Sequence, residues 1–171
     1  MDATVTWDKD LSFIGLAQSG FPIRLSSPSG PEVGAGPVEV TLMALAACTA
    51  MDVISILQKK KQTVTAFEVR AHAERAESYP TVITSAELEY VVTGSGLREE
   101  ALLRAIELSV KQYCPVHAML SKAFPIELRY TILEADGGGA ASIVRQGKCP
   151  RFPNDPERSV DQGGGNMGTA L

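Results

Sequence analysis

The fold is decided by an apolar stretch in the first third of the chain, which reads Leu42-Met43-Ala44-Leu45-Ala46-Ala47-Cys48-Thr49-Ala50-Met51-Asp52-Val53-Ile54. With its flanks it predicts one helix from about Pro37 to Lys61, roughly 35 Å long at 1.5 Å per residue. Pro37 suits a first helical turn, and the charges at the two ends match the helix dipole. The helix is apolar nearly all round, which is typical of a helix enclosed on most sides. One small domain would not enclose it alone, so we expect a second subunit to help.

The same stretch has about the length of a membrane span. It contains polar residues throughout, namely Glu39, Thr41, Thr49, Asp52 and Ser55. A carboxylate near the centre of a span costs roughly 2.5–3.5 kcal/mol. We therefore interpret the stretch as a buried helix of a soluble protein and expect no membrane partner.

Length and charge narrow the class of protein further. The 171 residues suffice for one domain, and the net charge of −4 argues against nucleic acid or an anionic membrane as a partner. The first five residues lack the basic and apolar regions of a secretory signal, so we expect a cytoplasmic protein. Disulfides are rare in that compartment and are mostly catalytic or sensory.

Around the central helix the pattern predicts short strands and two further helices. Apolar and polar residues alternate in three strands within residues 3–25, in a pair of strands around 67–71 and 86–92, and in a last strand at 125–133. Helices are expected at about 98–113 and 116–123. This order predicts an α+β domain over residues 1–135. Residues 137–171 hold eight glycines and three prolines, so we expect 136–171 to be a disordered tail.

Two cysteines carry the functional signal. Cys48 lies in the middle of the long helix, and Cys114 lies at a helix-breaking junction, Tyr113-Cys114-Pro115-Val116-His117. Free N–H groups and the dipole at a helix start favour a thiolate, so we expect a lowered pKa for Cys114. If the fold brings both sulfurs together, they form a redox centre; a disulfide needs Cα atoms within roughly 4.4–6.8 Å. Cys149, in the glycine-rich tail, is expected to be an exposed bystander.

Other interpretations of these residues stay open. Cys48 alone is most simply a small buried hydrophobe. Cys114 and His117 have a spacing compatible with zinc, with Cys48 as a third ligand, but structural zinc sites take four ligands in recognisable pairs. We therefore expect no metal and no cofactor.

Three more residues are candidate supporting groups. Asp52 is on the same helical face as Cys48 and suits a cap or an ion pair. Glu39 lies on the opposite side of that helix, so any effect on Cys48 is indirect. His117 is near enough to Cys114 to influence the pKa of its thiol, whereas His72 falls on the polar face of a strand.

The motifs resemble one known family. Gly36-Pro37-x-Glu39, Leu45-Ala46-Ala47-Cys48-Thr49-Ala50-Met51-Asp52-Val53 and Tyr113-Cys114-Pro115-Val116 are similar to those of the OsmC/Ohr proteins, which are osmotically inducible and organic hydroperoxide resistance proteins. The likeness covers residues 3–134 and is nearest to an OsmC-like branch. It implies an OsmC-like fold, with antiparallel sheets wrapped around a long buried helix in an intertwined homodimer. It also implies that Cys48 attacks the peroxide and Cys114 resolves it, with an organic hydroperoxide as substrate and a dithiol as reductant.

The chain departs from the best-studied members at two places. They carry an arginine in the loop between early strands, where this chain has Leu16-Ala17-Gln18-Ser19-Gly20; the nearest arginine is Arg24. They also carry a glutamate ten residues before the first cysteine, where this chain has Val38. A thiolate without its cationic partner is less populated. Two further functions are therefore weighed beside the peroxidase: binding of a small apolar ligand at the dimer interface, and redox sensing through a Cys48–Cys114 disulfide.

Overall fold

The computed structural model describes residues 1–27, 34–135, 141–150 and 152. In chain order the elements are β1 (Ala3–Lys9), β2 (Ser12–Ala17), β3 (Pro22–Ser26), α1 (Pro37–Lys59), β4 (Thr63–Arg75), β5 (Ile83–Ser95), α2 (Glu99–Leu108), the π-helical turn η1 (Ser109–Tyr113), α3 (Pro115–Leu120), β6 (Ile126–Ala135) and β7 (Ala141–Lys148). The α+β class is confirmed, and so is the predicted order of elements up to β6.

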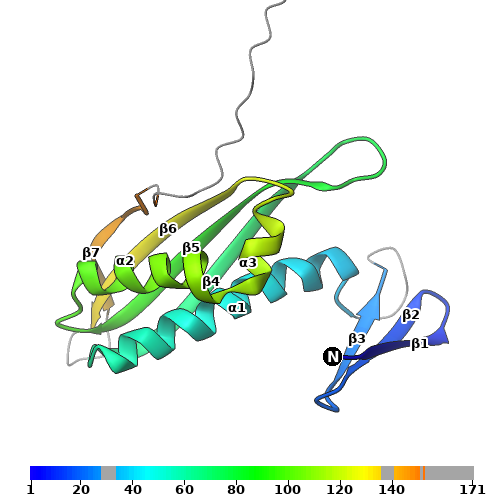
Figure 1. Ribbon diagram of the computed structural model, residues 1–171, viewed down its shortest axis with the longest axis horizontal. Coiled ribbons are helices and arrows are strands. Elements are labelled where there is room, and N and C mark those ends of the chain that lie inside the picture. Colours follow the sequence, from blue (N-terminus) through cyan, green and yellow to red (C-terminus); the bar gives the residue numbers. More distant parts are fainter. Residues whose placement is uncertain (28–33, 136–140, 151, 153–171) are drawn as a thin grey trace, which may run out of the picture.

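The three N-terminal strands form a sheet of their own. It is an antiparallel meander in the order β1-β2-β3, as the alternation predicts. The sheet stands beyond the N-terminal end of α1, apart from the rest of the molecule (Figure 1). Every residue of β1 is exposed, including Trp7 at 63%. In the single chain β1 is therefore open, whereas β2 and β3 are partly covered where they approach the start of α1.

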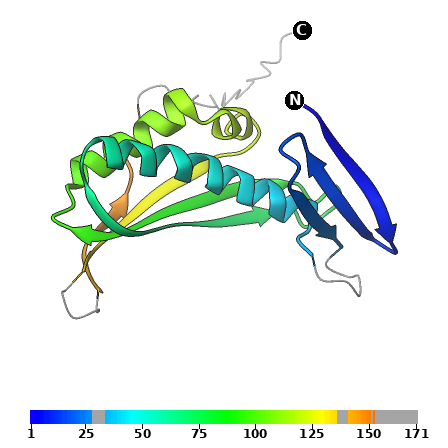
Figure 2. The ribbon, with the colours of Figure 1, turned by 90° about the horizontal axis from the view of Figure 1, so that it is seen from below.

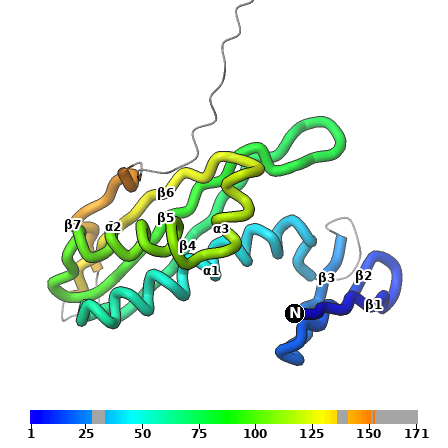
Figure 3. Tube along the Cα trace, in the orientation of Figure 1, coloured from blue at the N-terminus to red at the C-terminus, as the bar shows by residue number. Residues whose placement is uncertain are grey.

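The second sheet has the order β4-β5-β6-β7. Strands β4 and β5 are an antiparallel hairpin, whereas β5 and β6 pair in parallel. Parallel neighbours need a crossover, and here α2, η1 and α3 provide it. Figure 3 shows the chain leaving β5, passing through these helices and returning to β6. The sheet is thus mixed rather than wholly antiparallel.

All helices of the described residues lie on one face of the second sheet (Figures 1 and 2). Helix α1 contacts β4, α2, η1 and α3. One row of its side chains is fully buried in the core, namely Leu45, Thr49, Val53 and Leu57. By length and composition α1 could cross a membrane, yet this row packs with the sheet and α2 as the core of the domain.

The opposite side of α1 is open in the single chain, as expected for a helix that one small domain does not enclose alone. Met43 and Met51 are 51% and 66% exposed in the single chain. The helix is therefore half covered by its own domain, which leaves an apolar stripe open.

The prediction of a tail without structure from residue 136 onward is wrong for residues 141–148. These form β7, which pairs antiparallel with β6 and extends the sheet. The glycine-rich composition hid this strand because its hydrogen bonds are made with a distant edge and not within the segment. Residues 149, 150 and 152 follow without regular structure, and residues 136–140, 151 and 153–171 lie outside the described residues.

Candidate redox site

The fold brings Cys48 and Cys114 into contact. Cys48 lies midway along α1, Cys114 is the N-cap of α3, and α3 packs on α1. The two thiols are hydrogen-bonded to each other, and all three cysteines of the chain are free. The fold therefore places two free thiols next to each other.

The expectation of a lowered pKa for Cys114 is wrong. Its side chain is 3% exposed, and this burial raises the pKa of the thiol well above its usual range; the hydrogen bond with Cys48 raises it further. The helix start does act in the expected direction, because the His117 N–H donates to Cys114 Sγ at 3.3 Å. Helix α3 has only six residues, and desolvation outweighs its N–H groups.

Cys48 is the more accessible of the two thiols. The apolar stretch around it indicates a buried side chain, but in the structure Cys48 is only half-buried. The exposed residues Ala44, Ala47 and Met51 lie around it on α1. In the single chain Cys48 is therefore partly open on this side of α1, whereas Cys114 is buried.

Asp52 and Ser109 connect the two cysteine-bearing elements. Ser109 Oγ donates to Asp52 Oδ2 at 2.9 Å, and the Ser109 carbonyl accepts the Cys114 N–H at 2.8 Å. Ser109 is fully buried at the start of η1. Sequence reasoning missed it, although a signal exists: Ser109 continues the buried row Leu102, Ala105 and Ile106 of α2, where a polar residue is out of place.

Tyr90 and Thr49 make up the floor of the site. Tyr90 is fully buried on β5, and burial raises the pKa of its phenol, which the Thr49 hydroxyl partly offsets. The phenol is close enough to Cys114 and Asp52 for their charges to affect it. The Thr49 hydroxyl donates to the Ala46 carbonyl at 3.0 Å. Neither residue was predicted, because only the packing of β5 under α1 reveals them.

The other predicted supporting residues have local roles. Glu39 Oε2 accepts the Gly36 N–H at 2.7 Å and caps α1, about 14 Å along the axis from Cys48. His117 is buried, and it acts on Cys114 through its backbone N–H. His72 is exposed and pairs with Glu74, as its strand position predicts.

Cys149 is not the exposed bystander that was expected. It packs against the hydrophobic core, its N–H donates to the Leu128 carbonyl at 2.8 Å, and burial raises the pKa of its thiol to about 12. Strand β7 carries it there, so its burial follows from the missed strand.

Arg24, the arginine closest in sequence to the early loop, has a partner on its own sheet. It donates to Asp8 at 3.2 Å on the exposed N-terminal sheet. Among the described residues, no group of three or more histidine, cysteine, aspartate or glutamate side chains is arranged to hold a metal.

Comparisons with known proteins identify the family and related folds. The family model described as OsmC-like protein matches residues 29–129. Protein YhfA of Escherichia coli K12 is 41% identical over 135 residues, which are 79% of this chain and all of YhfA. An OsmC-like protein from Mycoplasma pneumoniae matches with a TM-score of 0.67 at 21% identity, covering 77% of this chain and 95% of its own. An organic hydroperoxide resistance protein OsmC from Legionella pneumophila matches with a TM-score of 0.57 at 12% identity, covering 77% and 94%.

Proposed function

Because this chain belongs to the OsmC-like protein family, we propose that it is a thiol-dependent peroxidase that reduces organic hydroperoxides to alcohols. The observation that carries the proposal is the contact between an accessible thiol, Cys48, and a buried one, Cys114. Two free thiols in contact are what a peroxide-reducing pair needs, since the second thiol protects the first from over-oxidation.

In the proposed reaction the Cys48 thiolate attacks the O–O bond of the hydroperoxide. One oxygen stays on sulfur as the sulfenic acid, and the other leaves as the alkoxide and takes a proton to become the alcohol. The Cys114 thiol then attacks the sulfenic sulfur. An S–S bond forms, the S–O bond breaks, and the thiol proton leaves with the hydroxyl as water. A dithiol reductant returns the disulfide to two thiols.

The different settings of the thiols fit these roles. Burial keeps Cys114 protonated, so it can donate a hydrogen bond to a Cys48 thiolate and later supply the proton for the departing water. Cys48 is the less buried of the two thiols, which suits the one that meets the peroxide first. The reaction needs no cofactor or metal, and a dithiol reductant suits the cytoplasm in which we place the protein.

We further propose that the working form is a homodimer. The apolar stripe of α1 and the open part of the N-terminal sheet are the two surfaces that a second copy would bury. In the best-studied members an arginine serves the thiolate; here Arg24 is on that sheet, and a second copy is the way to bring such a cation near Cys48.

The test is hydroperoxide consumption by the purified reduced protein with dithiothreitol and cumene hydroperoxide. Cys48→Ser should abolish turnover. Cys114→Ser should still reduce about one equivalent of peroxide and should accumulate a Cys48 sulfenic acid that dimedone traps. Cys149→Ser is the matched control and should retain turnover. Undiminished activity in Cys48→Ser would disprove the role of Cys48.

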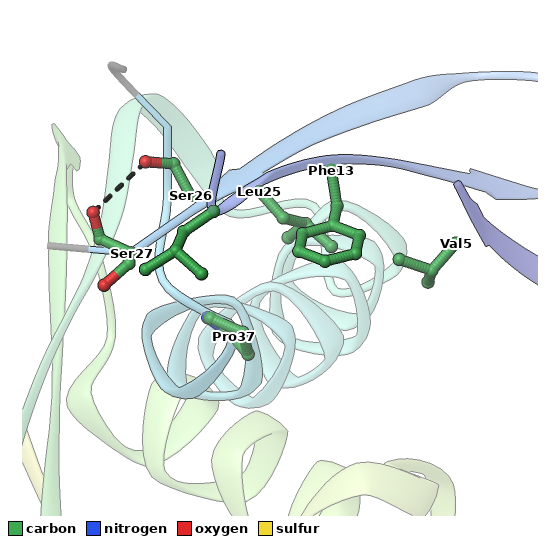
Figure 4. Close-up of a pocket in the computed structure, with 7 residues that line it drawn as sticks. Val5, Phe13, Leu25, Ser26, Ser27 and Pro37 are labelled. Carbon is green, nitrogen blue, oxygen red and sulfur yellow. Dashed lines mark hydrogen bonds between the residues drawn. The ribbon is translucent and has the colours of Figure 1, made fainter. Parts of the chain in front are cut away.

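A second function is supported by an apolar cavity of about 500 Å³ between the N-terminal sheet and the first turn of α1. Val5, Phe13 and Leu25 of the sheet line it together with Pro37 of the helix (Figure 4). A small apolar ligand would suit this lining. Pro37 is roughly 16 Å along α1 from Cys48, so this site is not beside the thiols of the same chain. A co-purifying ligand in native mass spectrometry, without peroxide turnover, would favour binding; oxidation to the disulfide without turnover would favour redox sensing.

A further inference from the structure

Ser109 makes hydrogen bonds to both of the segments that carry the cysteines of the redox site. Its hydroxyl is anchored to Asp52, one helical turn after Cys48 on α1, and its carbonyl accepts the backbone N–H of Cys114. The bonds form a closed circuit: Cys48 to Asp52 along the helix, Asp52 to Ser109 through side chains, Ser109 to Cys114 through the backbone, and Cys114 back to Cys48 through the thiols.

The carbonyl bond is possible only because the helix widens at this point. Cys114 N–H bonds to the carbonyl five residues earlier, which is the π-helical pattern, and the turn Ser109–Tyr113 is the π-helical segment. Such turns are rare and are frequent at functional sites. The backbone of Cys114, the N-cap of α3, is thus held to Ser109 where the chain passes from η1 into α3.

Burial strengthens the hydrogen bond between Ser109 and Asp52. Ser109 is 0% exposed, so its hydroxyl has no water to replace a lost partner. A buried hydroxyl bonded to a carboxylate forms a charge-assisted hydrogen bond, which is stronger than a neutral one. On the outer side of the same junction, Glu107 pairs with Lys111 at 2.8 Å and with Arg104 at 2.6 Å, and all three are at least partly exposed. Exposed pairs of this kind contribute little.

We propose that Ser109, held by Asp52, is a positioning residue that sets the separation of Cys48 and Cys114 and so controls how fast the disulfide forms. This rests on the proposed peroxidase cycle. The step it controls is the condensation of the Cys48 sulfenic acid with the Cys114 thiol, in which the S–S bond forms and water leaves. The attack of Cys48 on the peroxide does not involve Ser109.

The first experiment separates these two steps in a single turnover. Reduced Ser109→Ala is mixed with one equivalent of cumene hydroperoxide, and peroxide loss and disulfide formation are followed by quenched-flow and intact-mass analysis. Peroxide loss should keep its rate, whereas disulfide formation should slow roughly 10- to 100-fold, the penalty for misplacing a reacting group by about 1 Å. A dimedone adduct on Cys48 should accumulate. A merely structural role would lower the melting temperature without changing this partition.

Variants of Asp52 and Glu107 make the test specific. Asp52→Asn keeps an oxygen that accepts from Ser109 and should form the disulfide at nearly the native rate, whereas Asp52→Ala should slow it as Ser109→Ala does. The double variant should be no slower than either single one, because both remove the same bond. Glu107→Gln is the matched control and should have no effect. If Ser109→Ala does not fold, the same hydrogen bond is tested from its other partner on α1, by comparing the rates of disulfide formation in Asp52→Ala and Asp52→Asn.

A second readout needs no peroxide. In a dithiothreitol redox buffer, loss of positioning should lower the equilibrium constant for the Cys48–Cys114 disulfide roughly tenfold, which is about 30 mV. Native disulfide kinetics and potential in Ser109→Ala and in Asp52→Ala would overturn the inference even if peroxide turnover is confirmed. A changed potential in a protein that does not consume peroxide would uphold it while the proposed function fails.

Discussion

At the scale of single residues, two thiols are kept protonated by the fold. Burial raises the pKa of Cys149 to about 12 and raises that of Cys114 in the same direction. In the unfolded chain both ionise at about pH 8.5. Above that pH the unfolded chain releases protons that the folded chain retains, so folding binds protons and stability must fall as pH rises.

We therefore predict that the free energy of unfolding falls as pH increases from about 8.5 to 9.5, a range below the ordinary tyrosine pKa of about 10. Urea titrations at several pH values measure it. Cys149→Ser and Cys114→Ser should each flatten the pH dependence by a fraction of one proton, and the double variant should flatten it most. Stability that is constant over this range in the native chain would contradict the burial of these thiols.

The sequence predicts the two candidate cysteines but not their environments. A cysteine in an apolar helix and one before a proline can be recognised locally, and the family motif pairs them. Exposure and pKa depend on the groups that pack over each thiol, and these come from distant parts of the chain. That is why Cys114, placed at a favourable helix start, is nevertheless buried and protonated. Ser109 and Tyr90 also join the site through the packing of distant segments. The sequence around each of them has no pattern strong enough to identify it.

At the scale of elements, strand β5 passes very close to the start of β4. A Cβ atom at Gly94 would lie 2.0 Å from the Thr63 carbonyl oxygen and 3.1 Å from Leu97 Cδ1. The register of β4 on β5 also shifts between Val64 and Ala66, beside this position. Backbone atoms cannot move aside as a flexible side chain would.

Gly94→Ala should therefore lower the free energy of unfolding by roughly 1–3 kcal/mol, the usual cost of overpacking. Gly15→Ala on β2 is the matched control, because its new Cβ would meet its nearest atom at an ordinary 3.5 Å. Chemical denaturation of both variants measures the difference. Equal stability of Gly94→Ala and the native chain would mean that the two strands are farther apart than described.

Elements with a local pattern were predictable, and β7 was not. The alternation of apolar and polar residues and the position of Pro37 indicate strands and helix from the sequence alone. Strand β7 has only Ile143 and Val144 as large apolar residues, and both are at least half exposed. It is held by its pairing with β6 and by ion pairs such as Arg145 with Glu99 at 2.8 Å and Lys148 with Glu127 at 2.9 Å. Those partners lie up to 46 residues away, so no window around β7 reveals them.

At the scale of the whole molecule, the single chain leaves large apolar side chains open in two regions. Trp7 on β1 is 63% exposed, Phe21 in the turn between β2 and β3 is 79% exposed, and Met51 on α1 is 66% exposed. Large apolar side chains that gather on a surface mark interaction sites. The proposed second copy accounts for both, because a two-fold interface can bury the same stripe of α1 on each subunit.

Met51→Glu should place a charge in this interface and give a monomer. Sedimentation equilibrium at micromolar concentration should then change from twice the chain mass to the 18.2 kDa of one chain. Gln58→Glu is the control, since it adds the same charge at the exposed polar end of α1, next to Lys59-Lys60-Lys61, and should leave the dimer intact. A native chain that sediments as a monomer would remove the dimer proposal, because the stripe would then be open to water in the working protein.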